Sequence, residues 1–137
     1  MTTMTAPQIS YDDGAYRPGA CNIGPAEIAR RQRAGILGFA GAAVLAASLL
    51  VIGAAPIARL VVALPLAAGS IGLLQARFHF CVAFALAGLR DVGPLGGVER
   101  VTGAGARSAD LRTAALVTLL AAAIGAAGAA IFYLLPV

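Results

Sequence analysis

The stretch AGILGFAGAAVLAASLLVIGAA, residues 34–55, decides the class of protein because it contains no charged residue. An α-helix rises about 1.5 Å per residue, so roughly 20 such residues cross the hydrocarbon core of a bilayer. Two further apolar runs follow it, and the last of them, TAALVTLLAAAIGAAGAAIFYLL, again contains no charge. The sequence therefore predicts three transmembrane helices, at about residues 34–55, 57–77 and 111–135.

The composition supports a bilayer as the solvent. Apolar residues make up 60% of the 137 residues and charged residues only 12%, and the mean hydropathy is +0.88. This leaves too little polar surface to cover a water-soluble domain of this size. The predicted class is an all-α, polytopic membrane protein.

Charge and cysteine content exclude several other classes. The net charge of +4 comes from arginines that flank the apolar runs, so lipid headgroups are the expected partner and nucleic acid is not. Two cysteines separated by sixty residues form neither a disulfide framework nor a zinc motif. We expect no metal and no cofactor.

The arginines also predict the orientation. Pro56 ends the first run and leaves room for only a tight turn, so residues 24–90 should form a helical hairpin. Residues 1–23 are polar and predict a flexible tail. A Gly-rich loop is expected over residues 91–110, with Ser108 as N-cap and Asp110 in the first turn of the third helix. Nine of the ten arginines lie either before residue 34 or between residues 77 and 112, and so on one side of the predicted spans. The positive-inside rule then places the N-terminus and the loop in the cytoplasm and the C-terminus outside.

Two further groups of residues follow from this topology. The side chains expected at the headgroup level are Arg30, Arg31, Arg33, Arg77, His79 and Arg112. Small residues at four-residue spacings predict close helix contacts at Gly38, Ala42, Ala68, Gly72, Ala121, Gly125 and Ala129. In a sequence so rich in alanine, such spacings also arise by chance.

The stretch LQARFHFC, residues 74–81, holds the only candidate chemistry. If the second helix continues through it, Arg77 and Cys81 share a face, and the guanidinium would favour the thiolate. The alternative is that Arg77 extends to lipid phosphate while Cys81 is an inert apolar residue. Cys21 should lie on the same side of the membrane and could form a reversible thiol pair with Cys81. His79 fits an interfacial anchor better than a metal site, which would lack ligands.

Three residues near the first helix have structural expectations. Asn22 should hydrogen-bond the turn that leads into the helix, and Gly24 should allow a tight approach of the chain before Pro25. Glu27 should form surface ion pairs with the arginines three and four residues later.

Two separated stretches resemble a known family. The stretches CNIGPAEIARRQRAGILG (residues 21–38) and GLLQARFHFCVAFALAG (residues 72–88) are similar to the opening of the YgaP-like transmembrane domain and to the close of its second helix. Val82 stands where the family usually has proline and Phe84 where tyrosine is common, and the third helix has no counterpart. The resemblance covers about half of the chain and implies a two-helix hairpin in a bacterial inner membrane. Some members carry a fused rhodanese sulfurtransferase, which is not present in this sequence.

Three functions remain open. The preferred one is a non-enzymatic accessory or scaffold subunit that binds a membrane-protein partner, or another copy of itself, through its helices. The second is a thiol or sulfur-handling protein that uses Cys81, with Cys21 and Arg77. The third is an oligomeric transporter or channel, for which Ser70, Gln75, Thr113 and Thr118 would provide a thin polar lining. The arginine-only basic composition and the abundance of alanine and glycine indicate a bacterial source, and hence the bacterial cytoplasmic (inner) membrane.

Overall fold

The structure is a computed structural model, and it describes residues 16–92 and 97–137. Three helical segments, Pro25–Val51, Pro56–Phe78 and Ala104–Leu134, are long and apolar enough to cross a membrane, which confirms the predicted number of such helices. Residues 1–15 of the expected tail and residues 93–96 of the expected loop lie outside the described residues. The elements in chain order are α1 (Pro25–Val51), the 3-10 helix η1 (Pro56–Val62), α2 (Ala63–Phe78), α3 (Val82–Ala87), β1 (Leu89–Arg90), β2 (Glu99–Arg100) and α4 (Ala104–Leu134).

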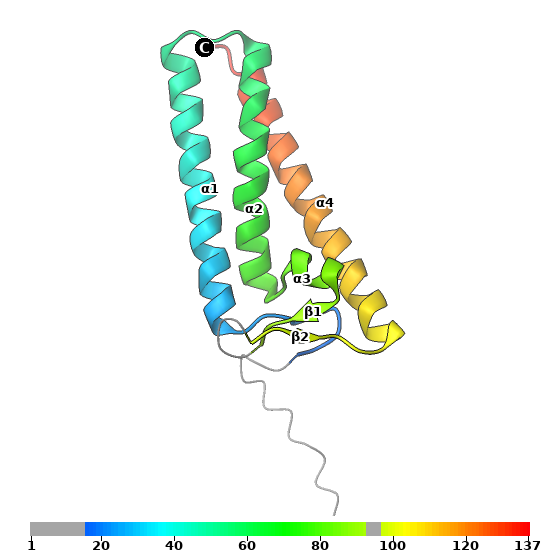
Figure 1. The fold of residues 1–137 in the computed structure, drawn as a ribbon. Coiled ribbons are helices and arrows are strands. Elements are labelled where there is room, and N and C mark those ends of the chain that lie inside the picture. The colour runs from blue at the N-terminus through cyan, green and yellow to red at the C-terminus, as the bar shows by residue number, and fades with distance from the viewer. Residues whose placement is uncertain (1–15, 93–96) are drawn as a thin grey trace, which may run out of the picture.

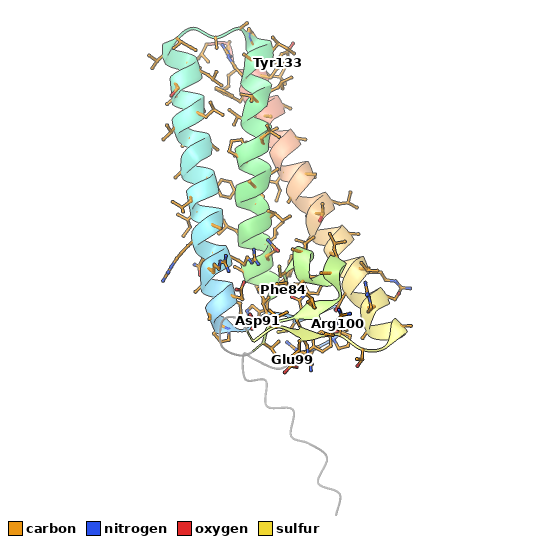
Figure 2. All side chains as sticks on the ribbon, in the orientation of Figure 1. Phe84, Asp91, Glu99, Arg100 and Tyr133 are labelled. Atoms are coloured by element: carbon orange, nitrogen blue, oxygen red, sulfur yellow. The ribbon has the colours of Figure 1, made fainter. Side chains whose placement is uncertain are left out.

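The long helices run up, down and up, with α2 packed against both α1 and α4 (Figure 1). The C-terminus lies at the same end as the turn between α1 and η1. The opposite end holds the segment before α1, the short helix α3 and the antiparallel strands β1 and β2, in which Arg90 faces Glu99. We call this the capped end. Figure 2 shows the labelled charged side chains Asp91, Glu99 and Arg100 at the capped end and Tyr133 at the other.

Glycines bring the backbones of α1 and α2 into direct contact. A Cβ atom added to Gly38 would lie 2.5 Å from the Cα of Gly69, and one added to Gly72 would lie 2.7 Å from the Cα of Gly35. Only glycine permits this approach, which is how membrane helices gain packing contacts without a hydrophobic driving force. Two of these four glycines are among the predicted contacts. Gly69, rather than Ala68, faces Gly38.

The contact between α4 and α2 also uses a predicted glycine. A Cβ atom added to Gly125 would lie 2.9 Å from both the carbonyl oxygen of Ala63 and the Cβ of Ala67. Ala121 and Ala129, one turn to either side, are buried, as is Ala42 on α1. Small residues therefore line both the contact between α1 and α2 and the contact between α2 and α4.

The second helix does not continue through LQARFHFC. It ends at Phe78, and His79 adopts a left-handed conformation with φ 54° and ψ 41°. The His79 N–H then donates to the carbonyl of Ala76, and the Phe80 N–H donates to the carbonyl of Gln75. These bonds satisfy carbonyl groups that would otherwise be unpaired at the helix end, and they turn the chain toward α3.

The third long helix begins earlier than predicted. Its first residue is Ala104 and its N-cap is Gly103, with φ 99°, so Ser108 lies within the helix and the prediction of a Ser108 cap is wrong. The expected loop over residues 91–110 therefore contains a first helical segment, as well as strand β2. Asp110 is buried within α4 and accepts hydrogen bonds from the segment before α1. The first turns of α4 are thus stabilised by contacts with residues that are more than ninety positions earlier in the sequence.

Candidate functional site

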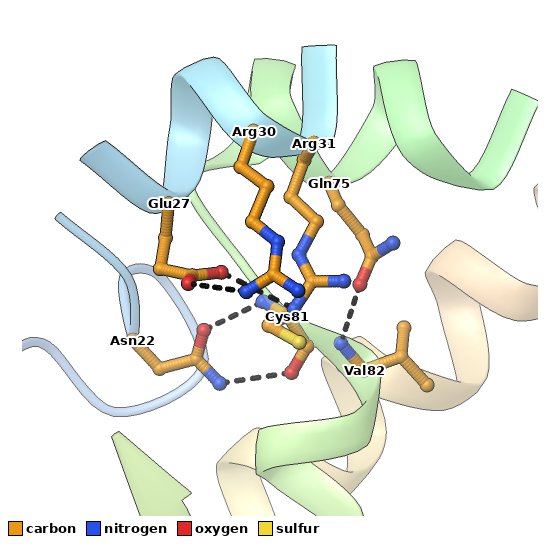
Figure 3. Close-up of polar contacts among 7 residues, drawn as sticks. All are labelled: Asn22, Glu27, Arg30, Arg31, Gln75, Cys81 and Val82. Atoms are coloured by element: carbon orange, nitrogen blue, oxygen red, sulfur yellow. Dashed lines mark hydrogen bonds and ion pairs between the residues drawn. The ribbon is translucent and has the colours of Figure 1, made fainter. Parts of the chain in front are cut away.

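The capped end is built around a pairing between Asn22 and the backbone of Cys81, both fully buried. The Cys81 N–H donates to Oδ1 of Asn22 at 2.6 Å, and Nδ2 of Asn22 donates to the Cys81 carbonyl at 3.0 Å (Figure 3). One side-chain amide thus replaces the two hydrogen bonds that a neighbouring strand would supply. We call this pair of bonds the amide clamp. It joins residues 59 apart in the sequence.

The backbone of Asn22 is held as firmly as its side chain. Its N–H donates to the carbonyl of His79 at 3.1 Å, and its carbonyl accepts from the N–H of Asp91 at 2.9 Å. The next bond runs from the N–H of Gly24 to the carbonyl of Asp91. A Cβ atom at Gly24 would lie 2.6 Å from the carbonyl oxygen of Val92, so this position requires glycine. Asn22 and Gly24 have structural roles, as expected. Their hydrogen-bond partners, however, lie near residues 80 and 91 and not in a local turn.

Gln75 connects the end of α2 to the start of α3. Its Oε1 accepts a hydrogen bond from the N–H of Val82 at 2.9 Å, and the side chain is buried. Because the first N–H groups of a helix lack partners within the helix, this bond caps α3. Gln75, which was one of the four polar residues expected to line a transporter or channel, therefore forms a structural hydrogen bond.

Glu27 forms a buried charge cluster above the amide clamp. Its side chain is 4% exposed and lies 3.4 Å from Arg30 and 3.3 Å from Arg31. Arg31 also lies over the ring of Phe84, 6.0 Å from its centroid. The prediction of a surface pair is wrong for the carboxylate, because the Glu27 side chain is buried. Of the two arginines, only Arg30 has a mainly exposed side chain.

Both thiols are buried. Cys81 is 0% and Cys21 is 3% exposed, and neither forms a disulfide. The thiol of Cys21 donates to the carbonyl of Ile23 at 3.5 Å. Because α2 ends before Cys81, Arg77 does not share a helix face with that thiol, and its side chain is exposed. A reactive cysteine needs both access and an electropositive neighbour, and in this conformation neither thiol is open to a reactant.

Residues 16–24 are not a free tail, and we call them the strap. Asp110 of α4 accepts hydrogen bonds from the hydroxyl of Tyr16 at 2.9 Å and from the N–H of Gly19 at 2.7 Å. The hydroxyl of Thr113 donates to the carbonyl of Gly19 at 2.6 Å. Burial, followed by the hydrogen bond to Asp110, raises the pKa of Tyr16 to about 12. The strap therefore ties the start of α1 to the start of α4.

The predicted headgroup residues lie on elements that meet at the capped end. Arg30, Arg33, Arg77 and Arg112 are exposed, whereas Arg31 and His79 are partly buried. Arg59, expected only as part of a turn, is buried at the opposite end. It donates to the carbonyls of Leu135, at 2.9 Å, and of Val137, and it lies 5.7 Å from the ring centroid of Phe132.

The remaining polar side chains bear on a metal site and on a polar lining. Within residues 16–92 and 97–137, no group of three or more His, Cys, Asp or Glu side chains could hold a metal ion. The hydroxyls of Thr113 and Thr118 both donate to backbone carbonyls, and Ser70 is buried. Thr113 thereby ties α4 to the segment before α1, whereas the bond of Thr118 stays within α4.

Comparisons with protein-family models, with curated proteins and with solved structures found no match to this chain.

Proposed function

We propose that this chain is a small, multi-pass protein of the bacterial inner membrane that acts as a non-enzymatic accessory or scaffold subunit. Its three long helices cross the bilayer, with the capped end in the cytoplasm and the C-terminus outside. The hairpin of α1 and α2 is similar in kind to the YgaP-like transmembrane domain, extended here by α4. Its partner is another membrane protein or a second copy of the chain.

The distribution of charge supports the membrane placement. Residues 34–51 of α1 hold no charge and span about 27 Å, close to the roughly 30 Å of the hydrocarbon core. The arginines at positions 30–33 and from 77 to 112 belong to elements that meet at the capped end, which the positive-inside rule assigns to the cytoplasm. The single arginine of the other end, Arg59, is buried against backbone carbonyls.

One observation carries the scaffold role: α1 is the least covered of the three helices. Only 11% of its most apolar window is buried, against 28% for each of the other two. Its outer face presents large apolar side chains at Ile36, Leu37 and Val44. On the same helix, a Cβ atom added to Gly41 would meet nothing within 4 Å. A small residue on an open face lets a partner helix approach closely.

Cysteine cross-linking in native membranes tests this role. Gly41→Cys places a thiol on the open face of α1, and Ala127→Cys places one on an exposed position of α4 as the matched control. We expect oxidation to give a discrete cross-linked product from position 41 and little from position 127. A chain that is monomeric in mild detergent, gives no product from position 41 and recovers no partner would contradict a scaffold role. Recovery of the chain from the soluble fraction without detergent would contradict the membrane placement.

The alternative functions gain no support from the geometry. A thiol relay needs access to Cys81, which is fully buried. A transport path needs polar side chains that face a common space, and those of α2 and α4 are engaged in structural hydrogen bonds or buried.

A further inference from the structure

A groove between α1 and α2 near the capped end combines polar and apolar side chains in its lining. Its volume is about 290 Å³, and its lining residues are Ile28, Gln32, Leu73, Ala76, Arg77 and His79. This is about ten times the share of liquid volume that one water occupies, roughly 30 Å³. The groove therefore has room for a phosphate group together with several carbon atoms.

The polar side chains of the groove have no hydrogen-bond or ion-pair partner in residues 16–92 and 97–137. Among the residues that the structure describes, none forms a hydrogen bond or ion pair with the side chain of Gln32, Arg77 or His79. The neighbouring Arg31, by contrast, is engaged by Glu27 and lies over Phe84. Successive residues of an α-helix are turned by about 100°, so Gln32 lies on a different face from Arg31. The groove thus offers a guanidinium and two further hydrogen-bond donors, with no carboxylate in its lining.

The position of the groove along the helices indicates what it meets. Arg77 directly follows the uncharged residues 60–76, and Gln32 lies just before the uncharged run that begins at Ala34. This is the depth at which hydrocarbon gives way to headgroups. Ile28, Leu73 and Ala76 supply an apolar floor beside the polar groups. Such a pairing fits a molecule with an anionic head and an apolar body.

His79 adds an independent observation. It is the only residue other than glycine with a positive φ among those that the structure describes, and it occupies a helix C-cap where glycine is usual. A side chain in the left-handed region is strained, and such strain concentrates at sites of function. The strained position sets the imidazole at the rim of the groove.

From these observations we infer that the groove binds the headgroup of an anionic phospholipid in the cytoplasmic leaflet. Arg77 pairs with a phosphate oxygen through a charge-assisted hydrogen bond, while Gln32 and His79 donate to the remaining oxygens. The apolar floor takes the glycerol and the first methylene groups of the acyl chains. The inference rests on the proposed membrane placement and deepens it, because it assigns a specific lipid site to one face of the hairpin.

The test is a lipid titration of the detergent-purified full chain, followed by native mass spectrometry. Phosphatidylglycerol and phosphatidylcholine with identical acyl chains are compared, and inorganic phosphate is titrated separately. We expect phosphatidylglycerol to bind more tightly than phosphatidylcholine, and Arg77→Gln to weaken its binding by about tenfold or more. Arg112→Gln removes an exposed arginine of α4 that does not line the groove, so it should change binding by less than about twofold.

His79→Gly separates a binding role from a structural one. Glycine relieves the left-handed strain, so the variant should melt at a higher temperature and yet bind phosphatidylglycerol more weakly. Equal losses in the Arg77 and Arg112 variants, equal affinity for both lipids, or tight binding of inorganic phosphate alone would overturn the lipid site. Membrane fractionation and position-41 cross-linking of the native chain would be unaffected by these outcomes, so they report separately on the proposed function.

Discussion

Removal of the amide clamp should be among the most damaging single changes outside the helix contacts. Asn22→Ala removes the bonds of 2.6 and 3.0 Å to Cys81 and leaves that residue's N–H and carbonyl groups buried without these partners. The Cys81 carbonyl keeps the hydrogen bond that it accepts from the N–H of Ala85 at 3.1 Å, so only the N–H is stranded. A stranded polar group costs about 1–3 kcal/mol, and we expect the free energy of unfolding to fall by about this amount. The lower end applies where water enters the vacated space. Asn22→Asp should also destabilise, because it replaces the donor to the Cys81 carbonyl with a second acceptor.

The buried thiols supply the assay. A fluorophore that reacts with thiols reports unfolding as Cys21 and Cys81 become exposed on heating in detergent. Gln32→Ala is the matched control, since it removes an exposed amide without structural hydrogen bonds and should change stability by less than about 0.5 kcal/mol. If Asn22→Ala melts together with the native chain and the control, the clamp does not hold the capped end, and our account of this end is refuted.

The helix contact, the strap and the buried arginine give three further predictions. Gly72→Ala should destabilise by about 1–3 kcal/mol because its Cβ meets the backbone of α1 at 2.7 Å, whereas Gly41→Ala, which meets nothing within 4 Å, should be neutral or slightly stabilising in the same denaturant titration. The pKa of Tyr16 is raised from 10.0 to about 12, so the bond to Asp110 stabilises the fold fully below pH 10 and is lost as the pH rises toward 12; melting temperatures across this range should show the loss in the native chain and not in Tyr16→Phe. Arg59→Gln should cost about 2–3 kcal/mol by losing charged donors to the C-terminal carbonyls, and unchanged proteolysis of the end of α4 would contradict this.

The long helices could be predicted from the sequence because hydrocarbon imposes a simple rule on composition. Uncharged runs of sufficient length mark them, and the structure has three helices of this kind. Glycines at Gly38, Gly72 and Gly125 were predicted as contact points from spacing alone, and each lies where a Cβ atom would strike a neighbouring helix. The contacts of Gly35 and Gly69 could not be predicted in this way, because no glycine, alanine or serine lies four positions before or after either residue.

The capped end could not be predicted, because its structure depends on contacts between distant segments. The run FHFC continues the apolar character of α2, so nothing local marks the break after Phe78. The break follows from the left-handed His79 and from the clamp that Asn22 supplies. Asp110 was read as a first-turn acid of a helix, whereas its partners Tyr16 and Gly19 are more than ninety residues away. The expectation that Arg77 and Cys81 share a helix face depended on a continuous helix, and α2 ends at Phe78 before it reaches Cys81.

The way the capped end is assembled has a consequence for biogenesis. Its hydrogen bonds join the strap to Cys81, to Asp91 and finally to Asp110 and Thr113. A ribosome that has released only the first two helices has produced a chain whose strap lacks its anchor on α4. A nascent chain arrested before residue 110 should therefore be digested at the strap by an added protease, whereas one arrested after α4 has emerged should resist. Insertion of the last helix would then act as the checkpoint at which the newly made protein escapes quality control.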